Sequence, residues 1–158
     1  MSHQEKKAGV LSKRVLVEMC VSGMNCVISK QKHYNKINVF PVADGDTGTN
    51  LALTFDGIID DIRRVQDESL ISTLTTLSNS ALMHARGNSG TIFAQFLVGF
   101  CEAIIQSQAP TDTELLLPVF VKAVETAYRY AYDALSSPQE GTILTVMKDF
   151  HGVCGSHK

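Results

Sequence analysis

The sequence predicts an all-α domain. Apolar residues recur every three to four positions in one segment after another, which is the spacing of a helix face. No alternating apolar–polar run typical of a half-buried strand stands out. The chain has 158 residues, of which 44% are hydrophobic, and this is enough to bury the core of one domain. The expected architecture is therefore a single bundle of helices, with residues 1–9 as a flexible, polar N-terminus.

The first half of the chain predicts two helices separated by an unusual loop. Residues 11–29 carry an apolar stripe, and the basic, polar residues 30–36 are expected to form a connector. The loop 38–50 follows, and Thr49 or Asn50 could cap a second helix that runs to about residue 65. The stripes consist of Leu16, Cys20, Met24, Val27 and Ile28 in the first helix, and of Leu51, Phe55, Ile58, Ile59 and Ile62 in the second.

The second half predicts four more helices. Apolar pairs recur every four residues in the helix expected at 89–107, so this helix should be buried on most of its sides. Pro118 is tolerable at the first position of the helix that follows. The full set of expected segments is a turn at 66–69, a helix at 70–84, a helix at 89–107, a break at 109–112, a helix at 117–135, a linker at 136–139 and a helix from 140 to about 151.

The loop 38–50 reads Asn-Val-Phe-Pro-Val-Ala-Asp-Gly-Asp-Thr-Gly-Thr-Asn. Two carboxylates, Asp44 and Asp46, flank one glycine, and small polar residues follow directly. Mg²⁺ prefers carboxylate and carbonyl oxygens and usually shares its coordination shell with phosphate. We therefore interpret this segment as a metal–phosphate loop. An EF-hand is rejected because its twelfth position would be Phe55 instead of glutamate.

A second polar segment, His84-Ala-Arg-Gly-Asn-Ser-Gly90, interrupts an apolar helical region. A glycine-rich turn that leads into a helix offers free N–H groups and the positive end of the helix dipole, which suits an anion. Arg86 could add positive charge. In an up-and-down bundle successive loops alternate between ends, so the loops before the second, fourth and sixth helices should share one end. This parity predicts that 38–50, 86–90 and the Gly141–Thr142 turn converge.

Three motifs occur in order: the loop 38–50, Ala-Arg-Gly-Asn-Ser-Gly and Glu-Gly-Thr-Ile-Leu-Thr-Val. Together they resemble the nucleotide-binding domain of the dihydroxyacetone kinase L-subunit family, and most closely the N-terminal ATP-binding domain of bacterial fatty acid kinases. The resemblance covers roughly residues 10–150. It implies an up-and-down helical barrel that binds ATP or ADP at one rim.

The resemblance also implies roles for individual residues. Asp44 and Asp46 would be the catalytic residues and would hold two Mg²⁺ ions that bridge the phosphates. Asn38 occupies approximately the place of a third aspartate in the dihydroxyacetone branch, and its amide oxygen is a candidate metal ligand. The candidate nucleotide-binding residues are Thr47, Gly48, Thr49, Asn50, Arg86, Gly87, Asn88, Ser89, Gly90 and Thr142.

The activity implied by the resemblance is phosphorylation of a fatty acid carboxylate that a separate lipid-binding protein presents. An ionised carboxylate needs no general base, which agrees with the lack of an obvious one here. Phosphoryl transfer depends mainly on positioning and charge neutralisation. Two alternatives stay open: a glycerone (dihydroxyacetone) kinase-type phosphotransferase domain, and a non-catalytic module that binds nucleotide or a partner.

One departure from the family pattern concerns the C-terminal end. In the family, further helices follow the third motif and carry an arginine and a glycine-rich turn, whereas residues 150–158 do not resemble that continuation. Residues 10–158 are therefore expected to form a partial, truncated ATP-binding kinase domain. Such a domain would expose apolar faces, for which a homodimer is one solution.

Composition excludes several other classes. A net charge of −2 gives no broad basic surface for nucleic acid. The four cysteines lack paired spacing, the N-terminus does not resemble a signal peptide, and the apolar run 91–105 is too short for a bilayer, so the chain is expected to be cytoplasmic without a transmembrane segment. His151, Cys154 and His157 have a spacing that could suggest zinc, but a fourth ligand is missing.

Overall fold

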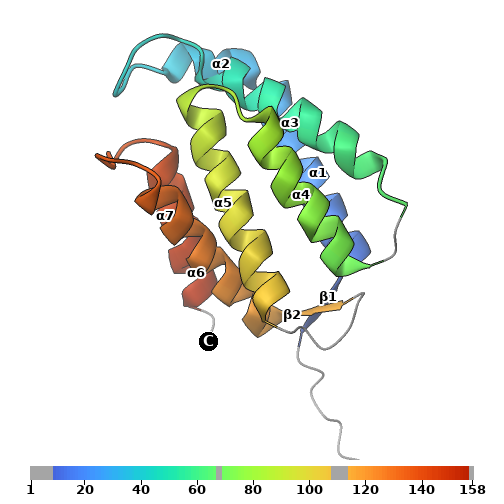
Figure 1. Cartoon of the computed structure of the whole chain (residues 1–158). Helices are drawn as coiled ribbons and strands as arrows, with labels where there is room; N and C mark the ends of the chain where they lie inside the picture. The colour runs from blue at the N-terminus through green and yellow to red at the C-terminus, as the bar shows by residue number, and fades with distance from the viewer. Residues whose placement is uncertain (1–8, 67–68, 108–113, 157–158) are drawn as a thin grey trace, which may run out of the picture.

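The structure is a computed structural model, and it describes residues 9–66, 69–107 and 114–156. In these ranges it is a helical bundle with one small antiparallel sheet (Figure 1), which confirms the predicted all-α class. The elements are β1 (Val10–Ser12), α1 (Lys13–Ser29), α2 (Gln31–Ile37), α3 (Thr47–Arg63), α4 (Leu70–His84), α5 (Gly87–Gln106), β2 (Glu114–Leu116), α6 (Leu117–Asp133) and α7 (Ile143–Gly155).

The structure differs from the sequence-based expectation in three places. The predicted connector 30–36 is largely the short helix α2. None of its residues is buried, and its sequence has no apolar stripe from which a helix could be predicted. The strands β1 and β2 pair antiparallel, with Val10 opposite Leu116, although no strand was expected. Each strand has only three residues, which is too short for an alternating pattern to be visible in the sequence. The helix α7 also continues to Gly155, beyond the expected end near His151.

Some expectations fall outside the described residues. These are the flexibility of residues 1–8, the break at 109–112, part of the turn at 66–69 and any metal-binding role of His157. Gly9 is described, and its carbonyl oxygen accepts a hydrogen bond of 2.9 Å from the Leu117 N–H, which extends the small sheet.

The helix α5 forms the centre of the bundle and packs against α3, α4 and α6. By length and composition alone α5 could cross a bilayer, but in this structure its apolar residues form the shared core. The alanine-rich face of α6 allows close approach to α5, and Gly99 of α5 lies directly under the Tyr130 ring of α6. The buried residues of α5 are Ser89, Gly90, Ala94, Leu97, Val98, Gly99, Phe100, Cys101 and Ile104.

The helix α7, like α1, buries only two residues. It packs chiefly on α6 and buries only Leu144 and Met147. On its other face Val146, Phe150 and Val153 are exposed.

The predicted parity of the loops is also observed. In Figure 1 the loops that precede α3, α5 and α7 all lie toward the upper end of the bundle, whereas β1 and β2 lie at the lower end. The three motif segments therefore share one end of the molecule.

Candidate functional site

The helix α2 fixes the beginning of α3 through a pair of reciprocal hydrogen bonds. The Thr49 N–H donates to the Asn35 side-chain oxygen at 3.0 Å, and the Asn35 amide donates back to the Thr49 hydroxyl at 2.9 Å. Gln31 also donates to this hydroxyl, at 3.0 Å. The contact is close enough to require Gly48, because a Cβ there would collide with the Gln31 carbonyl oxygen. In this structure the Thr49 hydroxyl therefore faces α2.

Asn38 closes the loop between α2 and α3. Its side-chain oxygen accepts hydrogen bonds from the Thr47 N–H at 3.2 Å and from the Thr47 hydroxyl at 2.8 Å. Its amide nitrogen donates to the Val42 carbonyl oxygen at 2.8 Å. Asn38 thus satisfies one of the free N–H groups at the start of α3 and holds the loop in shape. Because the same oxygen was the candidate metal ligand, it would have to exchange these bonds to bind a cation.

Asp44 and Asp46 lie on the last turn of the loop before α3. Asp44 is exposed and Asp46 is half-buried, and the intervening Gly45 has a positive φ of 66°. In the described part of the chain neither carboxylate has a hydrogen-bond or ion-pair partner, so both are free to bind. Two carboxylates beside a helix start form a donor set that fits Mg²⁺, which usually keeps several waters and phosphate oxygens as further ligands. No group of three or more His, Cys, Asp or Glu side chains gathers anywhere in the described ranges, so Asp44 and Asp46 form a pair without a third such ligand beside them.

The beginning of α5 carries the second motif. Arg86 stands at the N-cap position and its side chain makes no capping bond, and Arg86, Gly87 and Asn88 are exposed. The first N–H groups of a 20-residue helix are therefore available to an anion. Gly87 has φ of 57°, and a Cβ there would collide with the Asn50 side chain. This position therefore requires glycine for two independent reasons.

The first two motifs are held together by direct contacts. The Ser89 hydroxyl donates to the Thr47 carbonyl oxygen at 3.2 Å. Thr54, which is fully buried, donates to the Asn50 carbonyl oxygen at 2.8 Å and accepts from the Arg86 N–H at 3.0 Å. The starts of α3 and α5 therefore form one unit, as the parity of the loops predicts.

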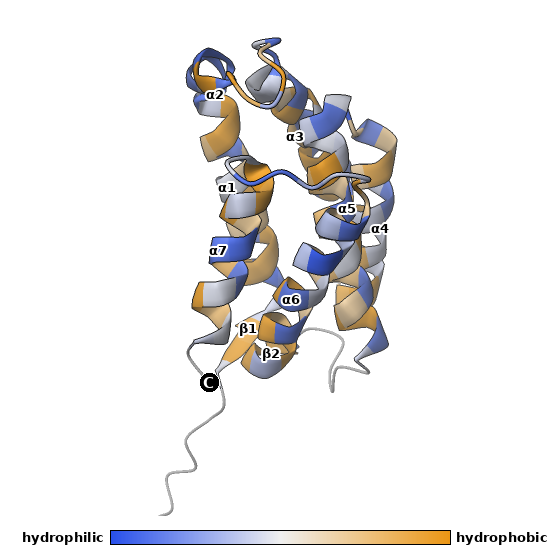
Figure 2. Cartoon of the chain, turned by 90° about the vertical axis from the view of Figure 1, so that its left-hand side faces the viewer, coloured by the Kyte–Doolittle hydropathy of each residue, from blue (hydrophilic) through white to orange (hydrophobic). Residues whose placement is uncertain are grey.

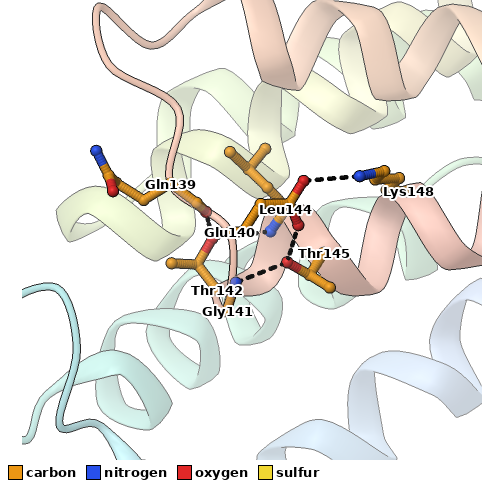
Figure 3. A network of polar contacts seen from close by, with 7 residues as sticks. All are labelled: Gln139, Glu140, Gly141, Thr142, Leu144, Thr145 and Lys148. Carbon is orange, nitrogen blue, oxygen red and sulfur yellow. Dashed lines mark hydrogen bonds and ion pairs between the residues drawn. The ribbon is translucent and has the colours of Figure 1, made fainter.

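The third motif lies at the same end but forms a network of its own (Figure 3). The Thr142 hydroxyl caps α7 by accepting from the Leu144 N–H at 3.3 Å and donates to the Gln139 carbonyl oxygen. Glu140 accepts from Thr145 and Lys148 at 2.7 Å each. The Lys148 ammonium and then the Thr145 hydroxyl lower the pKa of the Glu140 carboxyl. Within the described residues no hydrogen bond joins this network to the first two motifs.

A partly buried polar cluster lies behind the second motif. Asp61 of α3 accepts hydrogen bonds from the Ser80 hydroxyl at 2.7 Å and pairs with His84 Nε2 at 2.9 Å, both on α4. The Ser80 bond and then the His84 bond lower the pKa of the Asp61 carboxyl. Because the Ser80 hydroxyl donates to Asp61 and not to His84, the cluster lacks the geometry of a nucleophile activated by a base. It fixes the angle between α3 and α4 just before the α5 motif begins.

Sequence reasoning missed Gln31, Asn35 and Thr54. Gln31 and Asn35 are four residues apart in the segment expected to be a connector, and this spacing places both on one face if the segment is helical. Thr54 lies at a core position of the α3 stripe, where only its position one turn after Asn50 indicates that its hydroxyl can bond back to a helical carbonyl.

The fold is an all-α bundle in which two polar motifs are joined at one end by hydrogen bonds. The sequence profile of the DAK2 domain matches residues 41–157. The chain therefore belongs to the DAK2 domain family, which is associated with kinase function in general.

Several proteins of Staphylococcus aureus are similar to this chain. Uncharacterized proteins of strains USA300, NCTC 8325 / PS 47 and N315 are each 38% identical to it over 136 residues. The matched region is 86% of this chain and 24% of each relative. The chain thus spans about a quarter of the length of the curated relatives that it matches.

Proposed function

We propose that this chain is a phosphotransferase domain that binds ATP or ADP with Mg²⁺ at the joined starts of α3 and α5. The observation that carries the proposal is the juxtaposition of two unpartnered carboxylates with an uncapped helix N-terminus. Asp44 and Asp46 supply the negative charge that a cation needs, and the first N–H groups of α5 suit an anion. The hydrogen bond from Ser89 to the Thr47 carbonyl holds the two parts together.

Each group has a defined task in this proposal. Asp44 and Asp46 would hold the metal, expected to be two Mg²⁺ ions, which when bound would neutralise the charge on the phosphate oxygens. Gly87, Asn88 and the Arg86 side chain would orient the phosphates. Asn50 lies against Gly87 and would contact the same ligand. Catalysis would then rest on positioning and charge neutralisation, without a protein nucleophile.

The phosphoryl acceptor that fits these site residues best is a fatty acid carboxylate presented by a separate lipid-binding protein in the cytoplasm. A carboxylate is already ionised, so the transfer needs no base. This choice is supported by the resemblance of the three motifs to bacterial fatty acid kinases. A glycerone kinase-type acceptor, whose hydroxyl would lose a proton, is the alternative.

A specific observation also favours a non-catalytic nucleotide-binding module. The Thr142 hydroxyl is engaged in capping α7, and its network is separate from the other two motifs. If this segment stays apart, the nucleotide would be held at the phosphates only. Phosphate transfer to a lipid-loaded partner protein would exclude this alternative.

The test of the site is calorimetric titration of ADP into the chain with and without Mg²⁺. We expect Mg²⁺-dependent binding that is lost in Asp44→Asn and in Asp46→Asn, while helicity by circular dichroism is unchanged. Asp56→Asn and Asp60→Asn are matched controls, because they remove the same charge from exposed positions on α3 and should bind as the parent does. Unchanged binding in both Asp44 and Asp46 variants would refute the assignment.

A further inference from the structure

The segment that leads into the candidate site exposes both basic and apolar side chains. Four apolar residues at the end of α2 and in the loop after it are more than half exposed, with Val39 at 73% and Val42 at 58%. The lysines of the preceding stretch are exposed as well. We call this surface the basic–apolar rim, and it consists of Lys30, Lys32, Lys36, Ile37, Val39, Phe40 and Val42.

The rim is held in a defined shape. Asn38, in the middle of it, donates to the Val42 carbonyl and accepts from Thr47, so the loop is tied to α3. Asn35 and Gln31 tie α2 to the same helix. The exposed side chains are therefore presented on a fixed support, and in Figure 1 the loop between α2 and α3 projects from the upper end of the bundle. Figure 2 shows hydrophobic colouring along the chain that leaves α2.

The charge of the rim has one sign. No aspartate or glutamate occurs from residue 19 to residue 43, while this stretch contains three lysines. The nearest acidic groups in sequence are Asp44 and Asp46, which the proposed site assigns to a cation. The rim therefore complements an anionic surface.

A second exposed apolar surface, on α7, provides a contrast. Val146 and Val153 are exposed to a similar degree, at 67% and 59%, and Phe150 accompanies them. Here the charges are mixed, because Asp149 lies among the apolar residues and Lys148 is paired with Glu140. Apolar exposure alone therefore does not distinguish the rim from the α7 surface. The rim differs because its only charged residues are lysines, for which the described residues show no ion pair.

We propose that the basic–apolar rim docks on an anionic lipid surface. The apolar residues protrude from a loop, and short aliphatic and aromatic side chains of this kind enter the boundary between headgroups and acyl chains. Lysines beside them gain from the negative potential of anionic lipids. The inference goes beyond the proposed phosphotransferase site and is independent of it, since lipid binding needs neither nucleotide nor metal.

Docking of the rim would orient the candidate site relative to the lipid surface. Asp44 and Asp46 follow the rim directly and precede α3, so a docked rim would bring the candidate metal loop close to the lipid surface. The site would then bind an acyl-chain substrate, or the protein that carries it, close to the lipid surface.

The test is co-sedimentation of the full 158-residue chain with lipid vesicles, in EDTA and without nucleotide. One set of vesicles contains phosphatidylcholine with phosphatidylglycerol, and the other contains phosphatidylcholine alone. We expect binding to the anionic vesicles that weakens with added salt and is much lower on the neutral vesicles. Lys32→Glu with Lys36→Glu should reduce binding by roughly five-fold or more per lysine.

Matched variants locate the contact. Val39→Ser with Val42→Ser should reduce vesicle binding, whereas Val146→Ser with Val153→Ser on α7 should not, although the chemistry and exposure are similar. Lys122→Glu on α6 is the control for the charge change. Circular dichroism checks that each variant is folded.

Three results would overturn the proposal. These are the absence of sedimentation with anionic vesicles, equal binding to both kinds of vesicle, and equal loss in the rim and α7 variants. Self-association that only the rim variants abolish, with no vesicle binding, would instead assign the rim to a protein interface. None of these outcomes depends on ADP binding, so failure here is distinct from failure of the proposed function.

Discussion

Gly87 shows how a single residue can set the geometry of the candidate site. Its backbone has φ of 57°, and the space where a Cβ would stand is filled by Asn50. Gly141 also has a positive φ, of 80°, but nothing lies within 4 Å of its Cβ position. Substitutions at the two glycines therefore distinguish the free-energy cost of a side chain at positive φ from the cost of a steric clash.

We predict that Gly87→Ala destabilises the protein more than Gly141→Ala does. Alanine in the left-handed region costs roughly 1 kcal/mol in each variant, and only Gly87→Ala also displaces Asn50. The free energies of unfolding from urea titration measure the difference. Equal losses in the two variants would show that Asn50 moves aside freely.

Thr54 is the other residue on which the junction of the motifs depends. Its buried hydroxyl bonds both the Asn50 carbonyl and the Arg86 N–H. We predict that Thr54→Val, which keeps the shape but leaves the Arg86 N–H without its partner, costs about 1–3 kcal/mol of unfolding free energy. Thr54→Ser keeps the hydroxyl and should cost less. If denaturant titration ranks the two variants in the opposite order, packing of the methyl group and not the hydrogen bonds decides the stability.

At the scale of elements, Asp61 links the packing of α3 against α4 to a titratable group. The pKa of Asp61 is lowered in the folded state by its bonds to Ser80 and His84. A group with a lowered folded pKa contributes stability that is present above its unfolded pKa, near 4, and is lost as the pH falls through the lower folded pKa.

We therefore predict that Asp61→Asn loses roughly 1 kcal/mol of stability at neutral pH, a modest value because the Asp61 side chain is 28% exposed. The difference from the parent should shrink as the pH falls below about 4. Denaturant titrations at several pH values measure it. Asp60→Asn is a control, because this exposed neighbour should give no comparable pH-dependent difference.

The elements that the sequence predicted well are those with a continuous apolar stripe. The stripes of α3, α4 and α5 face the core, so burial and periodicity agree there. The helix α2 has no such stripe, and its position depends on side-chain bonds from Gln31 and Asn35 to Thr49, which lies in another element. The same holds for the site: the motif residues could be named from the sequence, but the Thr54 bridge needs the packing of α3 against α5.

At the scale of the whole molecule, stability should be uneven. The helix α5 is surrounded by three helices, whereas α7 packs chiefly on α6 and buries two residues. Local opening requires less free energy where few apolar contacts are lost. We predict that amides of α7 exchange with solvent deuterium faster than those of α5, as followed by mass spectrometry. Comparable protection in the two helices would mean that α7 opens only together with the core.

The small β1–β2 ladder has a consequence for how the chain assembles. It hydrogen-bonds the residues before α1 to those before α6, and thereby closes a ring that contains the first five helices. Sequential helix pairs can form through local contacts, but closing this ring costs the conformational entropy of a very long loop. The ladder is thus a long-range contact with few hydrogen bonds. It joins two segments that are far apart in the sequence and so links the start of the chain to the second half of the bundle.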